Sequence, residues 1–132
     1  MRAFREAVEA QDMDAVEALL AQDVVFTSPV VFKPYPGKVI TAAILHGVAR
    51  VFEDFRYVRE IGDPDGSDSA LMFAARVGDR ELTGCDFIHV NEEGLIDELT
   101  VMVRPLSGAQ ALQAAMGAQF EQIAKEAEAR LA

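Results

Sequence analysis

The chain has 132 residues, of which 51% are hydrophobic and 26% charged, the balance of a soluble globular protein with one substantial core. Its formal net charge of -10, without any basic run, argues against nucleic acid and anionic membrane surfaces as partners, because both carry negative charge. No apolar run is long enough to span a bilayer and no secretory pattern opens the chain, so a cytoplasmic location is expected.

The first part of the chain is mainly helical by its hydrophobic spacing. We expect, in chain order, a helix over 4–11, a helix over 13–21, a strand over 23–32, a turn-rich loop over 33–38 and a helix over 41–53. Asp12 and Thr41 are suitable N-caps for the second and third helices. Pro29 indicates an edge or a bulge in the strand.

The second part of the chain alternates apolar and polar residues with a period of two. Strands are expected over 55–61, 70–77, 81–90 and 95–104, joined by turns rich in Gly and Asp. Pro105 ends the last strand, and a capping box at Ser107 and Gln110 begins a final helix. This order predicts an α+β fold with helices on one face of a curved antiparallel sheet. We expect one domain over 1–132, with a core over 1–106 and a C-terminal helix over 107–131.

One carboxylate, Asp86, departs from the apolar pattern of its strand. Alternate side chains of a strand point the same way, so its face is shared by Leu82, Gly84, Ile88 and Val90. Burying a carboxylate is costly unless it is paired, hydrogen-bonded or neutral. Asp86 is interpreted either as a buried acid–base group with a raised pKa or as a structural residue. In the structural interpretation it bonds to backbone amides or to one of Thr27, Ser28 and Tyr35.

Several short segments occur in an order typical of one known superfamily. They are Asp12-Met13-Asp14-Ala15, Ser28-Pro29-Val30, Gly37, Gly84-Cys85-Asp86-Phe87, Asn91-Glu92-Glu93-Gly94-Leu95-Ile96 and Arg104-Pro105. With these segments the chain resembles the nuclear transport factor 2-like superfamily and, within it, the SnoaL-like (polyketide cyclase-like) proteins. The resemblance implies a cone, in which a cystatin-like curved sheet wraps the N-terminal helices and leaves a pocket at its open end. The superfamily contains isomerases, dehydratases, cyclases and epoxide hydrolases, so fold alone assigns no reaction.

The resemblance implies which reactions the residues fit. The ketosteroid isomerases use a helix tyrosine, a protonated aspartate and a second aspartate before a proline. Here these positions hold Phe4, Asp86 and Ser28, so only the protonated aspartate is matched. Phenylalanine has no proton to donate, and a serine without a histidine is a poor base, so isomerisation by that mechanism is not expected.

Two further reactions of the superfamily make different demands. The epoxide hydrolases place an arginine where this chain has Gly84, and a second carboxylate near the position of Val101. Their reaction is therefore not expected. The SnoaL-like cyclases need one pocket carboxylate as acid and base, and Asp86 is the residue to which we assign that role.

The predicted pocket is almost wholly apolar, which suits a small neutral or apolar molecule. The expected ligand-binding residues are Phe26, Ser28, Tyr35, Phe52, Tyr57, Phe73, Ile88, Val101 and Val103. Leu45, Leu82 and Leu99 are expected to complete the lining. The chain has no phosphate loop, paired cysteines or metal-ligand spacing, so neither a cofactor nor a metal is expected.

Three kinds of function remain open. The first is an enzyme of the cyclase, isomerase or dehydratase kind, the second a non-catalytic binding module, and the third an interaction protein with a filled cavity. Cys85, Phe87 and His89 point away from Asp86, and the resemblance implies a homodimer through this outer sheet face. His46 is a chemically suitable base, but its helix face, shared with Arg50 and Glu53, is expected to be solvated.

Overall fold

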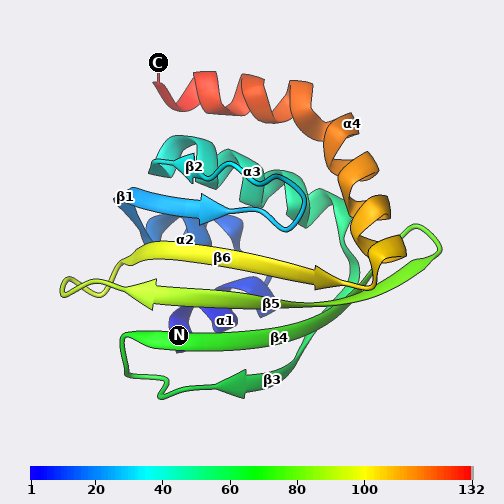
Figure 1. The fold of residues 1–132 in the computed structure, drawn as a ribbon. Helices are drawn as coiled ribbons and strands as arrows, with labels where there is room; N and C mark the ends of the chain where they lie inside the picture. Colours follow the sequence, from blue (N-terminus) through cyan, green and yellow to red (C-terminus); the bar gives the residue numbers. More distant parts are fainter. Residues whose placement is uncertain (132) are drawn as a thin grey trace.

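The computed structural model describes residues 1–131 as four helices on a six-stranded sheet (Figure 1). The helices are α1 (Arg2–Glu9), α2 (Met13–Ala18), α3 (Lys38–Val51) and α4 (Leu106–Leu131). The strands are β1 (Leu20–Thr27), β2 (Tyr35–Pro36), β3 (Glu53–Ile61), β4 (Asp68–Val77), β5 (Arg80–Val90) and β6 (Ile96–Arg104). Among residues 1–131, no helix has the length and apolar character needed to cross a bilayer.

The strands lie in the order β2-β1-β6-β5-β4-β3. Strands β3 to β6 form the predicted antiparallel meander. The sequence pattern did not show that β1 pairs in parallel with β6, nor that the loop before α3 contributes the two-residue strand β2. In Figure 1, α1 and α2 lie behind the curved sheet and α4 passes over α3. The predicted α+β fold class, with its C-terminal helix, is confirmed.

The boundaries around β1 and α3 differ from those expected. Strand β1 begins at Leu20 and ends at Thr27, because Pro29 has no amide proton to continue the ladder. Helix α3 begins at Lys38, and its N-cap is Gly37 with a φ of 102° rather than Thr41. Glycine takes this left-handed backbone without a Cβ penalty. Thr41 instead lies inside the helix, fully buried, with no hydrogen-bond partner for its Oγ1 among the described residues.

Helix α4 packs closely on α3. Gly47 of α3 makes this approach possible, because a Cβ at that position would lie 2.7 Å from Cδ1 of Ile123. Ile123 is itself almost fully buried. The helix begins at Leu106 directly after Pro105, so Ser107 lies within its first turn rather than before it.

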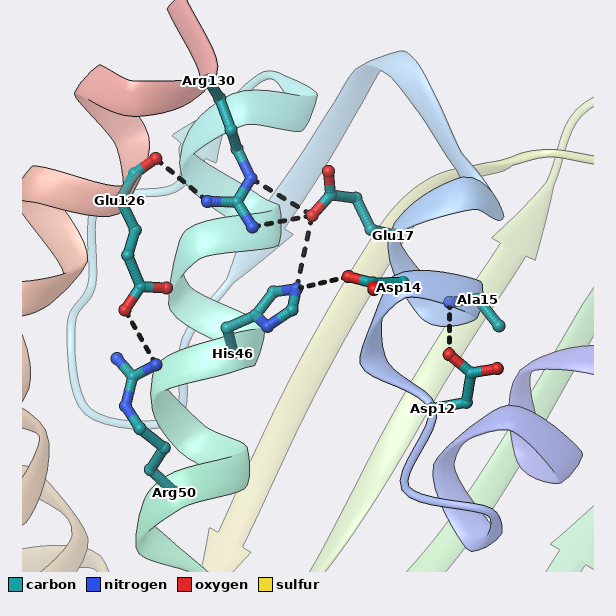
Figure 2. A network of polar contacts seen from close by, with 8 residues as sticks. All are labelled: Asp12, Asp14, Ala15, Glu17, His46, Arg50, Glu126 and Arg130. Atoms are coloured by element: carbon teal, nitrogen blue, oxygen red, sulfur yellow. Dashed lines mark hydrogen bonds and ion pairs between the residues drawn. The ribbon is translucent and has the colours of Figure 1, made fainter.

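Ion pairs hold the C-terminal half of α4 against the other helices (Figure 2). Arg130 places Nη2 at 2.8 Å from Oε1 of Glu17 on α2, and Arg50 of α3 places Nη1 at 2.8 Å from Oε1 of Glu126. The hydrogen bond from Arg130 is the main reason that the pKa of Glu17 is lowered. These ion pairs therefore fix the C-terminal half of α4 against α2 and α3.

Candidate functional site

Asp86 lies in the middle of β5, on the sheet face that the helices cover. Its register partners are Leu71 of β4 and Val101 of β6, so it is flanked by apolar side chains on both sides. The whole residue is 7% exposed. Alternation along β5 buries Leu82, Gly84, Asp86 and Ile88 together, as expected for one face of a strand.

The partner of Asp86 is Tyr57 of β3, whose hydroxyl donates a hydrogen bond to Oδ2 at 3.0 Å. The structure thus corrects the partners expected for a structural aspartate, which were backbone amides, Thr27, Ser28 or Tyr35. The two residues belong to strands separated by β4, and β3 carries an irregularity in its pairing between Tyr57 and Arg59. The contact joins residues on strands that are not neighbours, so the spacing of residues along either strand did not reveal it.

Burial raises the pKa of Asp86 to about 7, and the hydrogen bond from Tyr57 works in the opposite direction. The carboxyl is therefore present in both protonation states near neutral pH. Burial also raises the pKa of Tyr57, and the charge of Asp86 adds to that effect. Tyr57 thus keeps its proton and remains a donor when Asp86 ionises.

The ring of Tyr57 is fixed from several sides. The guanidinium of Arg5 on α1 lies over its face, 5.7 Å from the centroid, and donates a hydrogen bond to Glu60 at 3.1 Å. Phe55 meets the ring edge-on, with centroids 5.0 Å apart. A tyrosine held in this way presents its hydroxyl in one direction, towards Asp86.

Asp86 and Tyr57 open onto a cavity of about 620 Å³ between the sheet and the helices. This volume is in the range of small-molecule sites in proteins. Most of its wall is apolar, with contributions from Phe4, Val16, Phe26, Leu45, Phe52, Phe55, Phe73, Leu99 and Val101. Leu112 and Met116 of α4 complete the wall, so the C-terminal helix belongs to the site.

The structure distributes the nine expected ligand-binding residues between the cavity and the core. Phe26, Ser28, Phe52, Tyr57, Phe73 and Val101 line the cavity, whereas Tyr35, Ile88 and Val103 do not. Tyr35 sits on the short strand β2 and stacks on Phe26 at 6.3 Å between centroids. Ile88 is buried in the core, and Val103 lies near the end of β6 where α4 begins. Of the further expected lining residues, Leu45 and Leu99 contribute and Leu82 does not.

Besides Asp86 and Tyr57, the lining of the cavity includes the polar or charged residues Glu9, Gln11, Ser28, His46, Arg50 and Asp54. Ser28 lies at its wall and accepts a hydrogen bond from the amide of Val30 at 3.1 Å, so its own hydroxyl proton is not used there. Phe4, at the position of the isomerase tyrosine, is buried and also lines the cavity. Gly84, at the position of the hydrolase arginine, has no room for a side chain, because a Cβ would lie 2.3 Å from the ring of Phe73.

His46 was expected on a solvated helix face, and this expectation is wrong. Its side chain is only 21% exposed, it lines the cavity, and Glu53 belongs to β3 rather than to α3. Nε2 lies 3.3 Å from Oε1 of Glu17 and 3.9 Å from Oδ1 of Asp14 (Figure 2). The approach to Glu17 is close enough for an ion pair, but it is not aligned as a hydrogen bond, and Nε2 is otherwise unpartnered.

The outer face of the sheet carries the residues that point away from Asp86. Phe87 is exposed there, and Cys85 and His89 are half-buried. Within residues 1–131, one group of three side chains places its potential metal-ligating atoms close together. The group lies on this outer face and consists of His89, Asp97 and Glu98.

Comparison with known proteins agrees with this architecture. The SnoaL-like domain family matches residues 1–99. The chain belongs to the SnoaL-like family. The predicted resemblance to nuclear transport factor 2-like and polyketide cyclase-like proteins is thereby confirmed. A search of the curated proteins finds no match.

Several solved structures superpose on this one. A steroid delta-isomerase from Pseudomonas aeruginosa is 42% identical with a TM-score of 0.85, over 90% of this chain and 87% of that chain. An uncharacterised protein with a cystatin-like fold from Silicibacter pomeroyi is 38% identical with a TM-score of 0.88, over 99% and 92%. A proposed polyketide cyclase from Pseudomonas putida is 23% identical with a TM-score of 0.65, over 81% and 90%, a likeness of fold alone.

Proposed function

We propose that this SnoaL-like protein is a cofactor-independent enzyme that moves a proton on a small, neutral, largely apolar molecule, with Asp86 as its acid–base group. The observation that carries the proposal is the buried Asp86–Tyr57 pair on the wall of an apolar cavity. A general acid or base works best when its pKa is near the operating pH, and the pKa of Asp86 is raised to about 7. The reaction class is isomerisation, cyclisation or dehydration next to a carbonyl group.

Isomerisation shows how one carboxyl is sufficient. The carboxylate of Asp86 removes a proton from a carbon next to a carbonyl, and the electron pair moves to the carbonyl oxygen as an enolate. The neutral carboxyl then returns the proton to another carbon, so nothing is consumed. Tyr57 keeps Asp86 oriented through both steps, and the hydroxyl proton of Ser28 is free to donate to a ligand oxygen.

The apolar wall determines the class of ligand. A charged ligand group would lose its hydration against the apolar part of this wall, which includes Phe26, Phe52 and Phe73. A neutral ring system loses little on entry and gains the burial of its apolar surface. The steroid delta-isomerase that is 42% identical supports a cyclic ketone as the first substrate class to test.

The test is proton exchange and isomerisation catalysed by the purified chain. The probes are a β,γ-unsaturated 3-ketosteroid, followed by absorbance of the conjugated enone, and smaller cyclic ketones, followed by deuterium incorporation in NMR spectra. We expect turnover by the wild type and a loss of at least about 100-fold in Asp86→Asn, the usual contribution of a general acid–base group. Equal turnover by Asp86→Asn, or exchange no faster than in buffer for every probe, would refute the proposal.

A second candidate is a binding module without chemistry, in which Asp86 only anchors a ligand hydroxyl or carbonyl. The observation that favours it is the pair Phe4 and Ser28, which stand where the ketosteroid isomerases carry a tyrosine and an aspartate base. The two candidates predict different bound molecules in protein isolated from its own cells. Native mass spectrometry that finds a stoichiometric ligand, released unchanged, together with no exchange for any probe, supports the binding module.

We also propose that the protein acts as a homodimer through the outer face of the sheet. In register across β4, β5 and β6, this face presents Met72, Cys85 and Met102, with Phe87 beside them. Met102 is 59% exposed and Phe87 is 43% exposed. Burying a row of exposed apolar side chains under a second copy of the chain favours dimerisation.

A further inference from the structure

An irregularity in β6 brings two consecutive acidic residues to one side of the sheet. His89 of β5 pairs with Glu98, whereas its neighbour Val90 pairs with Ile96, so Asp97 is an extra residue in the ladder. Neighbouring residues of a regular strand point to opposite faces. A β-bulge places two residues opposite one, which lets Asp97 and Glu98 both approach His89.

The three side chains form a compact cluster. One ligand atom from each of His89, Asp97 and Glu98 lies within 4.8 Å of the others. The imidazole Nδ1 contacts Oδ1 of Asp97 at 2.5 Å. The side chains of His89 and Asp97 are 35% and 28% exposed. Solvent can therefore reach the cluster, although neighbouring residues cover most of both side chains.

The cluster carries an excess of negative charge. Asp68 of β4 is the register partner of His89 on its other side, so three carboxylates face one imidazole. The hydrogen bond that protonated His89 donates to Asp97 is the main cause of the raised pKa of His89, and the charges of Asp97, Asp68 and Glu98 add to it. No cation forms an ion pair with Asp68 or Glu98 among the ion pairs of residues 1–131. Carboxylates in such proximity attract a cation.

We propose that His89, Asp97 and Glu98 form a binding site for a divalent transition-metal ion such as Zn²⁺. One imidazole nitrogen and two carboxylate oxygens are a ligand set that such ions accept, whereas Ca²⁺ and Mg²⁺ prefer oxygen alone. Ligand atoms around tetrahedral Zn²⁺ lie about 3.4 Å apart, so the present cluster closes on the ion by small side-chain rotations.

A surface hollow next to the cluster leaves a coordination position open. It has a volume of about 430 Å³, and Asp68, His89, Glu98 and Thr100 are among its lining residues. Three protein ligands with a free fourth position resemble the arrangement in which zinc holds a water molecule. This site lies on the sheet face opposite to the cavity, and it is therefore independent of the function proposed for Asp86.

The test is calorimetric titration of the untagged chain with ZnCl₂. We expect one saturable site per chain in the wild type. Affinity should fall at least about tenfold in His89→Ala and in the isosteric variant Asp97→Asn, a loss typical of disrupted metal sites. The matched control is Glu92→Gln, which removes an exposed carboxylate from the adjoining turn and should leave the affinity within about twofold.

A second readout identifies the ligand. The sequence contains two histidines, so the imidazole resonances of His46 and His89 are separable in NMR spectra. Zn²⁺ should perturb the resonance of His89 and leave that of His46 in place, and MgCl₂ should perturb neither. Absence of saturable Zn²⁺ binding in the wild type, wild-type affinity in folded His89→Ala, or one ion per two chains would each overturn the proposal.

Discussion

The hydroxyl of Tyr57 donates to Oδ2 of Asp86 across a strand that separates them, at 3.0 Å inside the apolar layer. The two groups influence each other's protonation in opposite directions. The hydrogen bond lowers the pKa of Asp86, while the charge of Asp86 raises the pKa of Tyr57. The contact therefore holds a phenol that stays protonated beside a carboxyl that titrates, and the pH dependence of stability and of any catalysis follows from this pair.

Asp86→Asn should stabilise the protein at neutral and higher pH. The unfolded carboxyl ionises near 3.8 and the native one near 7, so between these values the unfolded state binds fewer protons. Wild-type stability therefore falls as pH rises through this window, and the full penalty, roughly 4 kcal/mol, is present above it. The asparagine variant has no such dependence, and its oxygen still accepts from Tyr57.

Denaturant unfolding at a series of pH values tests this prediction. The difference between the variant and the wild type should be near zero below pH 4 and should grow until about pH 7. Asp65→Asn, which neutralises an exposed turn carboxylate, is the matched control and should show no such growth. A difference that shrinks with rising pH would contradict a buried carboxyl with a raised pKa.

Tyr57→Phe should raise the pKa of Asp86 further above 7, because it removes the hydrogen bond that favours the ionised form. The variant should also lose about 1 to 2 kcal/mol of stability above that pH, since a buried carboxylate is left with one donor fewer. Carboxyl ¹³C NMR titration measures the pKa, with Asp86→Asn used to assign the signal. Tyr35→Phe is the control, and an unchanged or lowered pKa in Tyr57→Phe would count against the assignment.

Gly47→Ala should destabilise the wild-type protein but stabilise the Ile123→Ala variant. In the wild type its Cβ would lie 2.7 Å from Cδ1 of buried Ile123, and overpacking of this kind costs about 1 to 3 kcal/mol. In Ile123→Ala that atom is absent, and alanine gains up to about 1 kcal/mol over glycine within a helix. Thermal or denaturant unfolding of the four variants measures the coupling. Equal effects of Gly47→Ala in both backgrounds would show that the helices do not meet at this point.

Arg130→Met should loosen the C-terminal half of α4. The variant keeps most of the side-chain length but removes the ion pair with Glu17, at a cost of about 1 kcal/mol. The lowered pKa of Glu17 means that this stabilisation is present above the ordinary carboxyl range and is lost as pH falls through it. Amide exchange should become faster over 117–131 at neutral pH, and the difference should shrink in acid.

Lys125→Met is the control for Arg130→Met. It removes an exposed pair between Lys125 and Glu121 on the same helix, at 3.5 Å, and should change neither stability nor exchange by a comparable amount. If both variants exchange at the wild-type rate, the contact with Glu17 does not fasten the helix.

Met102→Glu should convert the proposed homodimer to a monomer. The substitution places a charge at the β6 end of the apolar row on the outer face, where a second copy would have to desolvate it. Sedimentation velocity measures the mass in solution. Phe120→Glu, at an exposed apolar position of α4, is the control and should leave the oligomeric state unchanged. A wild-type chain that sediments as a monomer at high concentration would contradict the dimer.

Hydrophobic periodicity predicted the fold well and the details of the site less well. The change of period after residue 53 predicted the meander, because alternation reflects which side chains are buried. Sequence reasoning did not identify Tyr57 as the partner of Asp86, and it did not find the cluster of His89 with Asp97 and Glu98. The first joins two strands that are not neighbours, and the second depends on the pairing irregularity in β6, where an extra residue changes which side chains lie opposite each other.

The order of helices and strands, and the strand face to which Asp86 belongs, follow from local spacing in the chain alone, since each depends only on residues a few positions apart. Tertiary packing decided the parallel pairing of β1 with β6 and the closure of the cavity by α4. It also decided that the cavity wall does not include Tyr35, Ile88 or Val103. Such features join residues far apart in sequence, and their geometry is set by how the elements fill space against one another.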